Sequence, residues 1–143
     1  MKFKFTLQAL ESLREKAREE ALQAYARTVQ QRVHVDERLQ ETQEKLERIP
    51  TETSMDKITI HIQTLNHIQM LRSRIDNLKT HIKTLKQEET KRLNHFLSCK
   101  KDVEILKKLK EKQRFLVEKT LLKIEENALG DWAQSMYKNQ NLC

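Results

Sequence analysis

Three histidines recur every fourteen residues in the chain, at His67, His81 and His95. Fourteen residues of α-helix span about 21 Å, so these side chains cannot bind one metal ion together. Each histidine stands one place before an apolar residue of a helical stripe, which indicates that it flanks a helix seam. The sequence therefore predicts no metal site.

Two cysteines, Cys99 and Cys143, are the other residues that could carry chemistry. They are far apart, and neither belongs to a Cys-x-x-Cys pair or a Cys/His cluster, so neither a zinc site nor a structural disulfide is expected. The chain also has no glycine-rich phosphate loop, no His-Glu-x-x-His motif and no nucleophile in a recognisable setting. We therefore predict no catalytic residue, no cofactor and no enzymatic activity.

The composition is that of helices that bury only a narrow stripe. Of the 143 residues, 37% are hydrophobic and 34% are charged, with one glycine and one proline, and this balance is typical of a coiled coil. No apolar run approaches the roughly 20 residues of a membrane span, and the first residues lack the apolar run of a signal peptide. The sequence predicts an all-α protein of the cytosol.

The longest helical pattern runs from Met55 to Leu129, with apolar residues at three- and four-residue steps. It predicts a second helix over about residues 54–129, followed by a tail at 130–143 in which Gly130 ends the helix. A stripe from Leu7 to Ile49 predicts a first helix over about residues 6–49. Pro50 disfavours helical geometry at Ile49, which places the turn at residues 50–53.

A turn this short makes neighbouring helices antiparallel. Folding the chain at about residue 52 sets Ala21 opposite Ile82 and Val35 opposite Ile68, and the two apolar stripes then coincide. The mean spacing near 3.5 predicts a left-handed antiparallel coiled-coil hairpin in a single domain, residues 1–143, with the second helix longer than the first. Arg32, inside the first stripe, is expected to set the register as a polar position.

In this register Leu7, at the amino-terminal end of the first helix, lies opposite Phe96. Residues 97–129 should therefore project as a single helix with an unpaired apolar stripe. The projecting part is also basic, because residues 100–123 hold nine basic and four acidic groups. The basic groups encircle the helix, alternate with acidic ones and lack stacking aromatics, which favours an acidic protein partner over nucleic acid. A scaffold that dimerises through this arm and a basic nucleic-acid binder stay open as alternatives.

The amino-terminal segment Phe3-Lys4-Phe5-Thr6-Leu7-Gln8-Ala9-Leu10 resembles the Phe-x-Phe-x-x-x-x-Leu opening of the flagellar export protein FliJ family. The segments 21–26 and 107–114, with the acidic tail, are also similar to that family, and the resemblance covers nearly the whole chain. The family commonly has an Asp-Glu pair where this chain has Gly130-Asp131, which suggests that the helix stops earlier here.

The resemblance implies a cytoplasmic component of the bacterial flagellar type III export apparatus, peripherally associated with the inner membrane at the flagellar base. Proteins of this family act as a coiled-coil stalk in the central hole of the hexameric export ATPase. They activate that ATPase, contact the cytosolic domain of the export gate and cycle export chaperones. The implied protein is a monomer when free, with no nucleic acid and no membrane insertion. The YscO-type stalk of virulence injectisomes is the alternative with the same architecture.

The resemblance also implies two sets of contact residues. One set faces the ATPase ring: Phe3, Phe5, Leu10, Arg14, Lys108 and Arg114. The other set maps by position onto the gate-binding segment of the second helix: Leu71, Ile75, Leu78 and Ile82. Most of the second set also falls on the intramolecular stripe, so an equally good interpretation is that these residues form the helix seam.

Overall fold

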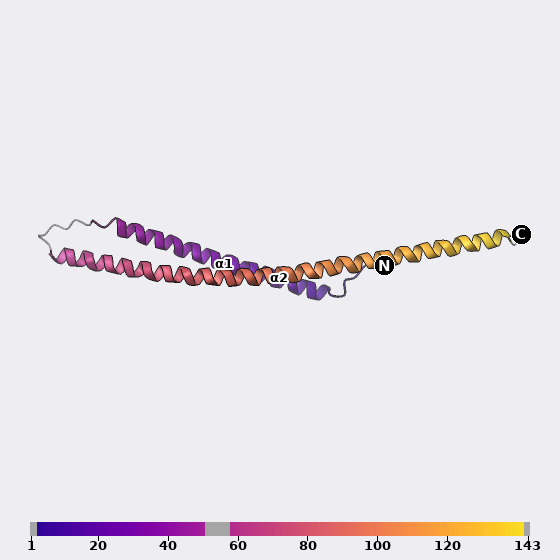
Figure 1. Cartoon of the computed structure of the whole chain (residues 1–143), viewed down its shortest axis with the longest axis horizontal. Helices are drawn as coiled ribbons and strands as arrows, with labels where there is room; N and C mark the ends of the chain where they lie inside the picture. The colour runs from indigo at the N-terminus through magenta and orange to yellow at the C-terminus, as the bar shows by residue number, and fades with distance from the viewer. Residues whose placement is uncertain (1–2, 51–57, 142–143) are drawn as a thin grey trace. The chain divides into compact units, whose positions relative to one another are not determined.

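The structure is a computed structural model that describes residues 3–50 and 58–141. Within these ranges the chain forms two α-helices and no strand (Figure 1). Helix α1 spans Gln8–Glu47 and helix α2 spans Ile58–Asn141. The prediction of an all-α protein with a longer second helix is confirmed.

The two ends of α1 follow from local hydrogen bonding. The backbone N–H of Gln8 donates to the carbonyl of Phe5, which forms a turn before the helix. At the other end the N–H of Ile49 donates to the carbonyl of Leu46, a tighter turn just before Pro50. Proline disfavours helical geometry in the preceding residue, so α1 ends about where the sequence indicated. The predicted turn at residues 50–53 lies almost wholly outside the described residues.

The predicted end of the second helix is wrong. Helix α2 continues through Gly130 to Asn141, and Gly130 does not adopt the positive φ of a helix-ending glycine. A glycine inside a helix costs only about 1 kcal/mol relative to alanine, and no proline follows it. Good helix formers on both sides therefore carry the helix across this position, and the segment expected to be a tail is helical.

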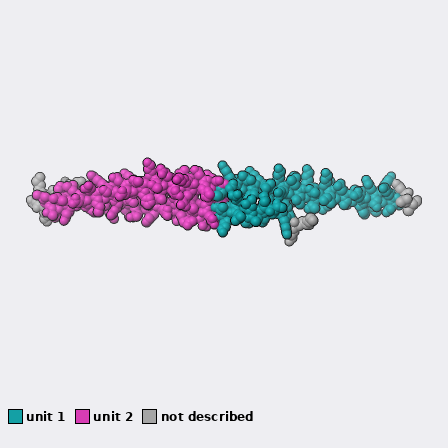
Figure 2. Space-filling model, turned by 90° about the horizontal axis from the view of Figure 1, so that it is seen from below, with its two compact units in different colours: residues 1–17, 99–143 teal, residues 18–98 magenta. Residues whose placement is uncertain are grey.

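Two compact units make up the chain, and each contains part of both helices (Figure 2). Unit 1 comprises Met1–Ala17 and Cys99–Cys143, and unit 2 comprises Arg18–Ser98. Each unit is described by itself below.

In unit 2 the helices pack antiparallel around a core of Val35, Leu78 and Ile82, with Leu39 and Leu85 against it. The guanidinium of Arg32, three residues before Val35, donates a hydrogen bond to Glu89, seven residues after Ile82. Residues earlier in α1 thus contact residues later in α2, as in an antiparallel pair. The predicted register is wrong here, because Val35 packs with Ile82 and not with Ile68. The difference is fourteen residues, or two heptads, and such a shift leaves apolar positions facing apolar positions.

Unit 1 has the same antiparallel arrangement, with Arg14 paired to Asp102 and Glu11 paired to Lys110. Its core holds Phe5, Glu11, Cys99, Val103 and Leu106. The stripe predicted at the start of the first helix is wrong, since Leu7 and Leu10 are 37% exposed and Leu13 is 63% exposed. Glu11 is 5% exposed in their place, and it lies on the same seven-residue row as the partly buried Arg32 and Leu39.

The register also changes which parts of α2 are uncovered. Helix α1 reaches Leu106 and Lys110 in unit 1, so the single-helix arm starts later than the predicted residue 97. At the other end, the first buried residue of α2 in unit 2 is Leu71. Within the described part of the chain no residue from Ile58 to Met70 is buried, and only Thr64 and Ile68 among them are partly buried.

Candidate functional site

The arm of α2 in unit 1 is an exposed helix rich in apolar side chains. Every residue from 114 to 140 is exposed. Large apolar residues among them are between 38% and 68% exposed: Phe115, Leu116, Val117, Leu121, Leu122, Ile124, Leu129, Trp132, Met136 and Tyr137. An exposed helix with this many large apolar side chains is typical of a protein interaction site. We call residues 114–140 the α2 arm.

One face of the α2 arm repeats every seventh residue. Phe115, Leu122, Leu129 and Met136 follow one another at this interval, and Trp132 lies three residues after Leu129. The polar residues Thr120, Asn127 and Gln134 repeat at the same interval on a different side of the helix. A heptad of apolar residues against a heptad of polar ones is the pattern of a helix that packs against other helices along this face.

Lys110 ties the start of the chain to α2 in unit 1. Its Nζ lies 3.6 Å from Glu11 Oε2, donates a hydrogen bond to Gln8 Oε1 at 3.4 Å, and lies 5.9 Å from the centre of the Phe5 ring. Glu11 Oε2 is buried and accepts no hydrogen bond, so the nearby ammonium is what compensates its burial. We call Phe5, Gln8, Glu11 and Lys110 the amino-terminal clasp.

The sequence did not single out Lys110 or Glu11. Lys110 was one of nine basic residues in its stretch, and Glu11 stood between the apolar Leu10 and Leu13. A signal did exist, because Glu11 lies three heptads before Arg32, the polar residue that the pattern did identify. Extending the heptad of Arg32 toward the amino terminus would have placed Glu11 on the buried side.

The residues predicted to face the ATPase ring do not share one environment. Phe5 is buried under Lys110, and Arg14 pairs with Asp102 at 3.5 Å. Phe3 is half-buried and Lys108 is exposed, whereas Arg114 pairs with Glu118 of its own helix at 3.5 Å. All six belong to unit 1, but only the side chains of Leu10, Arg14, Lys108 and Arg114 offer substantial exposed surface.

A small groove in unit 1 brings two of the predicted residues together. Leu10 and Arg14 line it with Asp102, Ile105 and Leu106, and its volume is 170 Å³. Ile105 is 63% exposed and Leu10 is 37% exposed, so both apolar side chains are accessible at this groove. The Arg14–Asp102 pair supplies charge beside them.

The four residues predicted to bind the export gate lie in the seam of unit 2. Leu71 is 1% exposed, and Ile75, Leu78 and Ile82 are also buried. In this conformation a partner could not reach them without displacing α1. Exposed apolar residues precede them on the same helix: Ile58, Ile60, Ile62, Leu65 and Met70. These five residues form what we call the α2 entry surface.

The described residues lack two features that would indicate other functions. No group of histidine, cysteine and carboxylate side chains in residues 3–50 and 58–141 could hold a metal ion. No described helix is long and apolar enough to cross a membrane.

Comparison with known protein families identifies the chain. The family described as "Flagellar FliJ protein" matches residues 3–142. The chain belongs to the FliJ family. This confirms the family assigned from the terminal and central segments, and the match extends through the helical residues after Gly130. No curated protein and no solved structure was found to match the chain.

Family membership defines the function at a coarse level. The FliJ family is a non-catalytic component of flagellar protein export, so this chain functions in flagellum biogenesis and protein export. Its long helices and exposed apolar surfaces suit a protein that works by binding other proteins.

Proposed function

We propose that this FliJ-family chain is the central stalk that binds and activates the hexameric ATPase of flagellar export. The observation that carries the proposal is the α2 arm, an exposed helix with an apolar residue at every seventh position. A single helix cannot bury such a face by itself, and a ring of identical subunits around a central hole supplies surface on all sides of it. The flagellar description of the family favours this role over that of an injectisome stalk.

The α2 arm would enter the ring, with the predicted ring-facing residues of unit 1 close to the entry. Of these residues, Leu10, Arg14, Lys108 and Arg114 are exposed, which supports a direct contact with the ring. Phe5 acts in this proposal through the amino-terminal clasp, and the half-buried Phe3 lies two residues before it. Basic groups at 100–114 would meet acidic groups of the ATPase and speed association through electrostatic steering.

The contact with the export gate is proposed for unit 2. The α2 entry surface makes the direct contact, because it is exposed and directly precedes Leu71 on the same helix. Leu71, Ile75, Leu78 and Ile82 would hold that helix in place from the seam. Export chaperones and a peripheral position at the inner membrane belong to the same proposal and follow from the family role.

ATPase turnover tests the stalk role. The rate of the purified export ATPase is measured against the concentration of added wild-type protein, which should raise both turnover and ring assembly. The double variant Leu122→Glu/Leu129→Glu should need at least about tenfold more protein for half-maximal stimulation, because each buried leucine contributes about 1.5–3 kcal/mol. The matched control is Asn127→Glu/Gln134→Glu, which adds the same charge to the polar face and should leave stimulation unchanged.

Two results would contradict this proposal. If wild-type protein alters neither the rate nor the assembly of the ring, the chain is not an activating stalk. If both double variants lose stimulation equally, added negative charge is responsible and the apolar face is not the ring contact.

The gate contact has its own test. Ile62→Asp/Leu65→Asp changes two exposed residues of the α2 entry surface, so the helix pair should keep its melting temperature while binding to the purified gate domain is lost. Gln63→Asp/Asn66→Asp is the control at exposed polar positions of the same segment. Unchanged binding of the first variant would place the gate contact elsewhere.

A further inference from the structure

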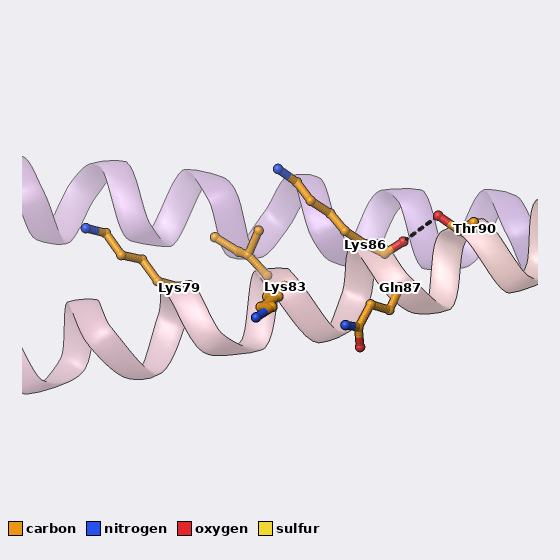
Figure 3. A pocket seen from close by; sticks show the side chains of 6 residues that line it. Lys79, Lys83, Lys86, Gln87 and Thr90 are labelled. Atoms are coloured by element: carbon orange, nitrogen blue, oxygen red, sulfur yellow. Dashed lines mark hydrogen bonds between the residues drawn. The ribbon is translucent and has the colours of Figure 1, made fainter.

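A row of three lysines on α2 of unit 2 is not used by the stalk or gate contacts. Lys79, Lys83 and Lys86 are exposed and follow at steps of four and three, so they lie along one side of the helix (Figure 3). They line a groove of 460 Å³ together with Ile82, Gln87 and Thr90. We call this surface the lysine groove.

The charge of the lysine groove is not compensated within the described part of the chain. None of the three lysines forms an ion pair there, although Lys79 also borders a second hollow that contains Glu47 and Asp76. Of the acidic residues of α2 near the row, Glu88 pairs with Arg92 and Glu89 with Arg32, whereas Asp76 lies three residues before Lys79 and borders only that end of the row. Lysines at neighbouring turns repel one another, so this row destabilises the helix until an anion binds.

The same row of heptad positions is compensated in unit 1. Three heptads further along α2 it reads Lys100, Glu104, Lys107, Glu111, Arg114 and Glu118, with opposite charges at alternate positions. Arg114 and Glu118 form an ion pair at 3.5 Å. Three successive lysines on this row, after Asp76, therefore occur in unit 2 and not on this side of α2 in general.

From this contrast we infer that the lysine groove binds an acidic α-helix of a partner protein. A helix that lies alongside α2 and carries carboxylates at steps of four and three has the spacing of the lysine row, because both rows rise by the same amount per residue. The lysine stems and Ile82 give the partner an apolar floor, as flanking positions do in coiled coils.

The lining of the groove does not favour nucleic acid. It contains no arginine for bidentate phosphate contacts and no aromatic residue on which a base could stack. Gln87 and Thr90 add a neutral amide and hydroxyl, and the Thr90 hydroxyl already donates to the carbonyl of Lys86 at 3.1 Å. This inference goes beyond the proposed stalk function and uses none of its contact residues except the supporting Ile82.

A designed peptide tests the inference on the full-length protein. The probe is a fluorescent helical peptide of about three heptads with glutamates at steps of four and three along one flank. Its anisotropy should report binding that weakens steeply between about 0.01 M and 1 M salt, over which the screening length falls from about 30 Å to 3 Å. A peptide of the same composition with its glutamates spread around the helix should bind at least about tenfold more weakly.

Variants of the protein separate the groove from general positive charge. Lys79→Gln/Lys83→Gln/Lys86→Gln should weaken binding of the peptide by about tenfold or more. The control Lys4→Gln/Lys16→Gln/Lys45→Gln removes the same charge at exposed positions and should leave binding unchanged. Charge reversal is the second arm: Lys79→Glu/Lys83→Glu/Lys86→Glu should bind the peptide in which lysines replace the glutamates.

Three outcomes would overturn the inference. They are equal weakening by the two glutamine triples, equal binding of the two acidic peptides, and duplex DNA binding that depends on the three lysines while no peptide binds. Circular dichroism of each variant verifies that the helices are intact. ATPase stimulation is a separate readout, so failure here leaves the stalk proposal standing and the reverse also holds.

Discussion

Each of the two units has a charged residue in its helix seam, and the units differ in how completely that charge is paired. In unit 2 the guanidinium of Arg32 binds both Glu89 and Asp36, and these bonds, with that to Glu89 foremost, raise the pKa of Arg32 despite its partial burial. In unit 1 the buried Glu11 has Lys110 at 3.6 Å and no hydrogen bond to Oε2. In unit 2 the seam charge is paired with two carboxylates, whereas in unit 1 the seam charge is compensated by one lysine.

The comparison also shows how the register is chosen. Glu11 and Arg32 are three heptads apart in α1, and their partners Lys110 and Glu89 are three heptads apart in α2. A slip of one heptad would set Arg32 opposite Ile82 in unit 2 and Glu11 opposite Val103 in unit 1. Glu11 would lose Lys110, and Arg32 would lose Glu89 and keep only Asp36 of its own helix; removing the partner of a buried charge costs several kcal/mol in a protein interior. Apolar stripes allow many registers, and the charged pairs select one of them.

The contribution of the Arg32 charge to stability should not change with pH near neutrality. A raised pKa of Arg32 means that its contribution to stability is fully present below the ordinary pKa of arginine. The contribution is lost only as the pH rises through the raised value, which lies in strongly alkaline solution.

The largest expected effect comes from the apolar core of unit 2. Leu71→Ala should lower the free energy of unfolding by about 2–5 kcal/mol, because a fully buried leucine is replaced and a cavity forms. Urea unfolding followed by circular dichroism measures it. Leu65→Ala, at a position that is 50% exposed on the same helix, should change the value by no more than about 0.5 kcal/mol. Equal effects would mean that α1 does not cover Leu71.

A smaller effect is expected from the amino-terminal clasp of unit 1. Lys110→Met leaves the Glu11 carboxylate buried without a partner and should cost about 1–3 kcal/mol, since Lys110 itself is partly exposed. The double variant Glu11→Leu/Lys110→Met should recover most of that loss, because an apolar pair needs no compensation. Both are measured by urea unfolding. A double variant as unstable as Lys110→Met would show that the lysine acts through Phe5 or Gln8.

The smallest effect concerns the α2 arm. Gly130→Ala should stabilise the helix by about 0.5–1 kcal/mol, because a Cβ at this position meets no atom within 4 Å. Every residue of the arm is exposed, so the gain should appear in amide exchange of residues near 130 and not in the global unfolding midpoint. Faster exchange in the variant would contradict the helical assignment of residues after Gly130.

Sequence reasoning predicted which elements form but not how they are aligned. The uninterrupted apolar steps after Met55 and the proline at position 50 were enough for two helices and an antiparallel pair. Register was beyond reach because Val35 meets an apolar residue at Ile68 and again at Ile82, two heptads apart. The same ambiguity shifted the start of the predicted arm and hid the α2 entry surface.

The candidate sites were predictable to a similar degree. The basic arm and its apolar residues are visible in the sequence, because they depend on composition and period alone. The clasp of Lys110 and Glu11 depends on which residue of α2 lies opposite Glu11, and so does the burial of Leu71 and its neighbours. Such features are consequences of register, and a single sequence leaves register undetermined.

The charged residues in the seam have one further consequence, for encounters between two copies of the chain. If two α1 helices met side by side in parallel, Glu11 would face its own duplicate and so would Arg32; two α2 helices would likewise set Lys110 against Lys110 and Glu89 against Glu89. Like charges at such positions exclude a parallel pairing. The seam charges thus disfavour the parallel homotypic coiled coil that the apolar stripes alone would allow. They favour packing of each helix against the other helix of the same chain.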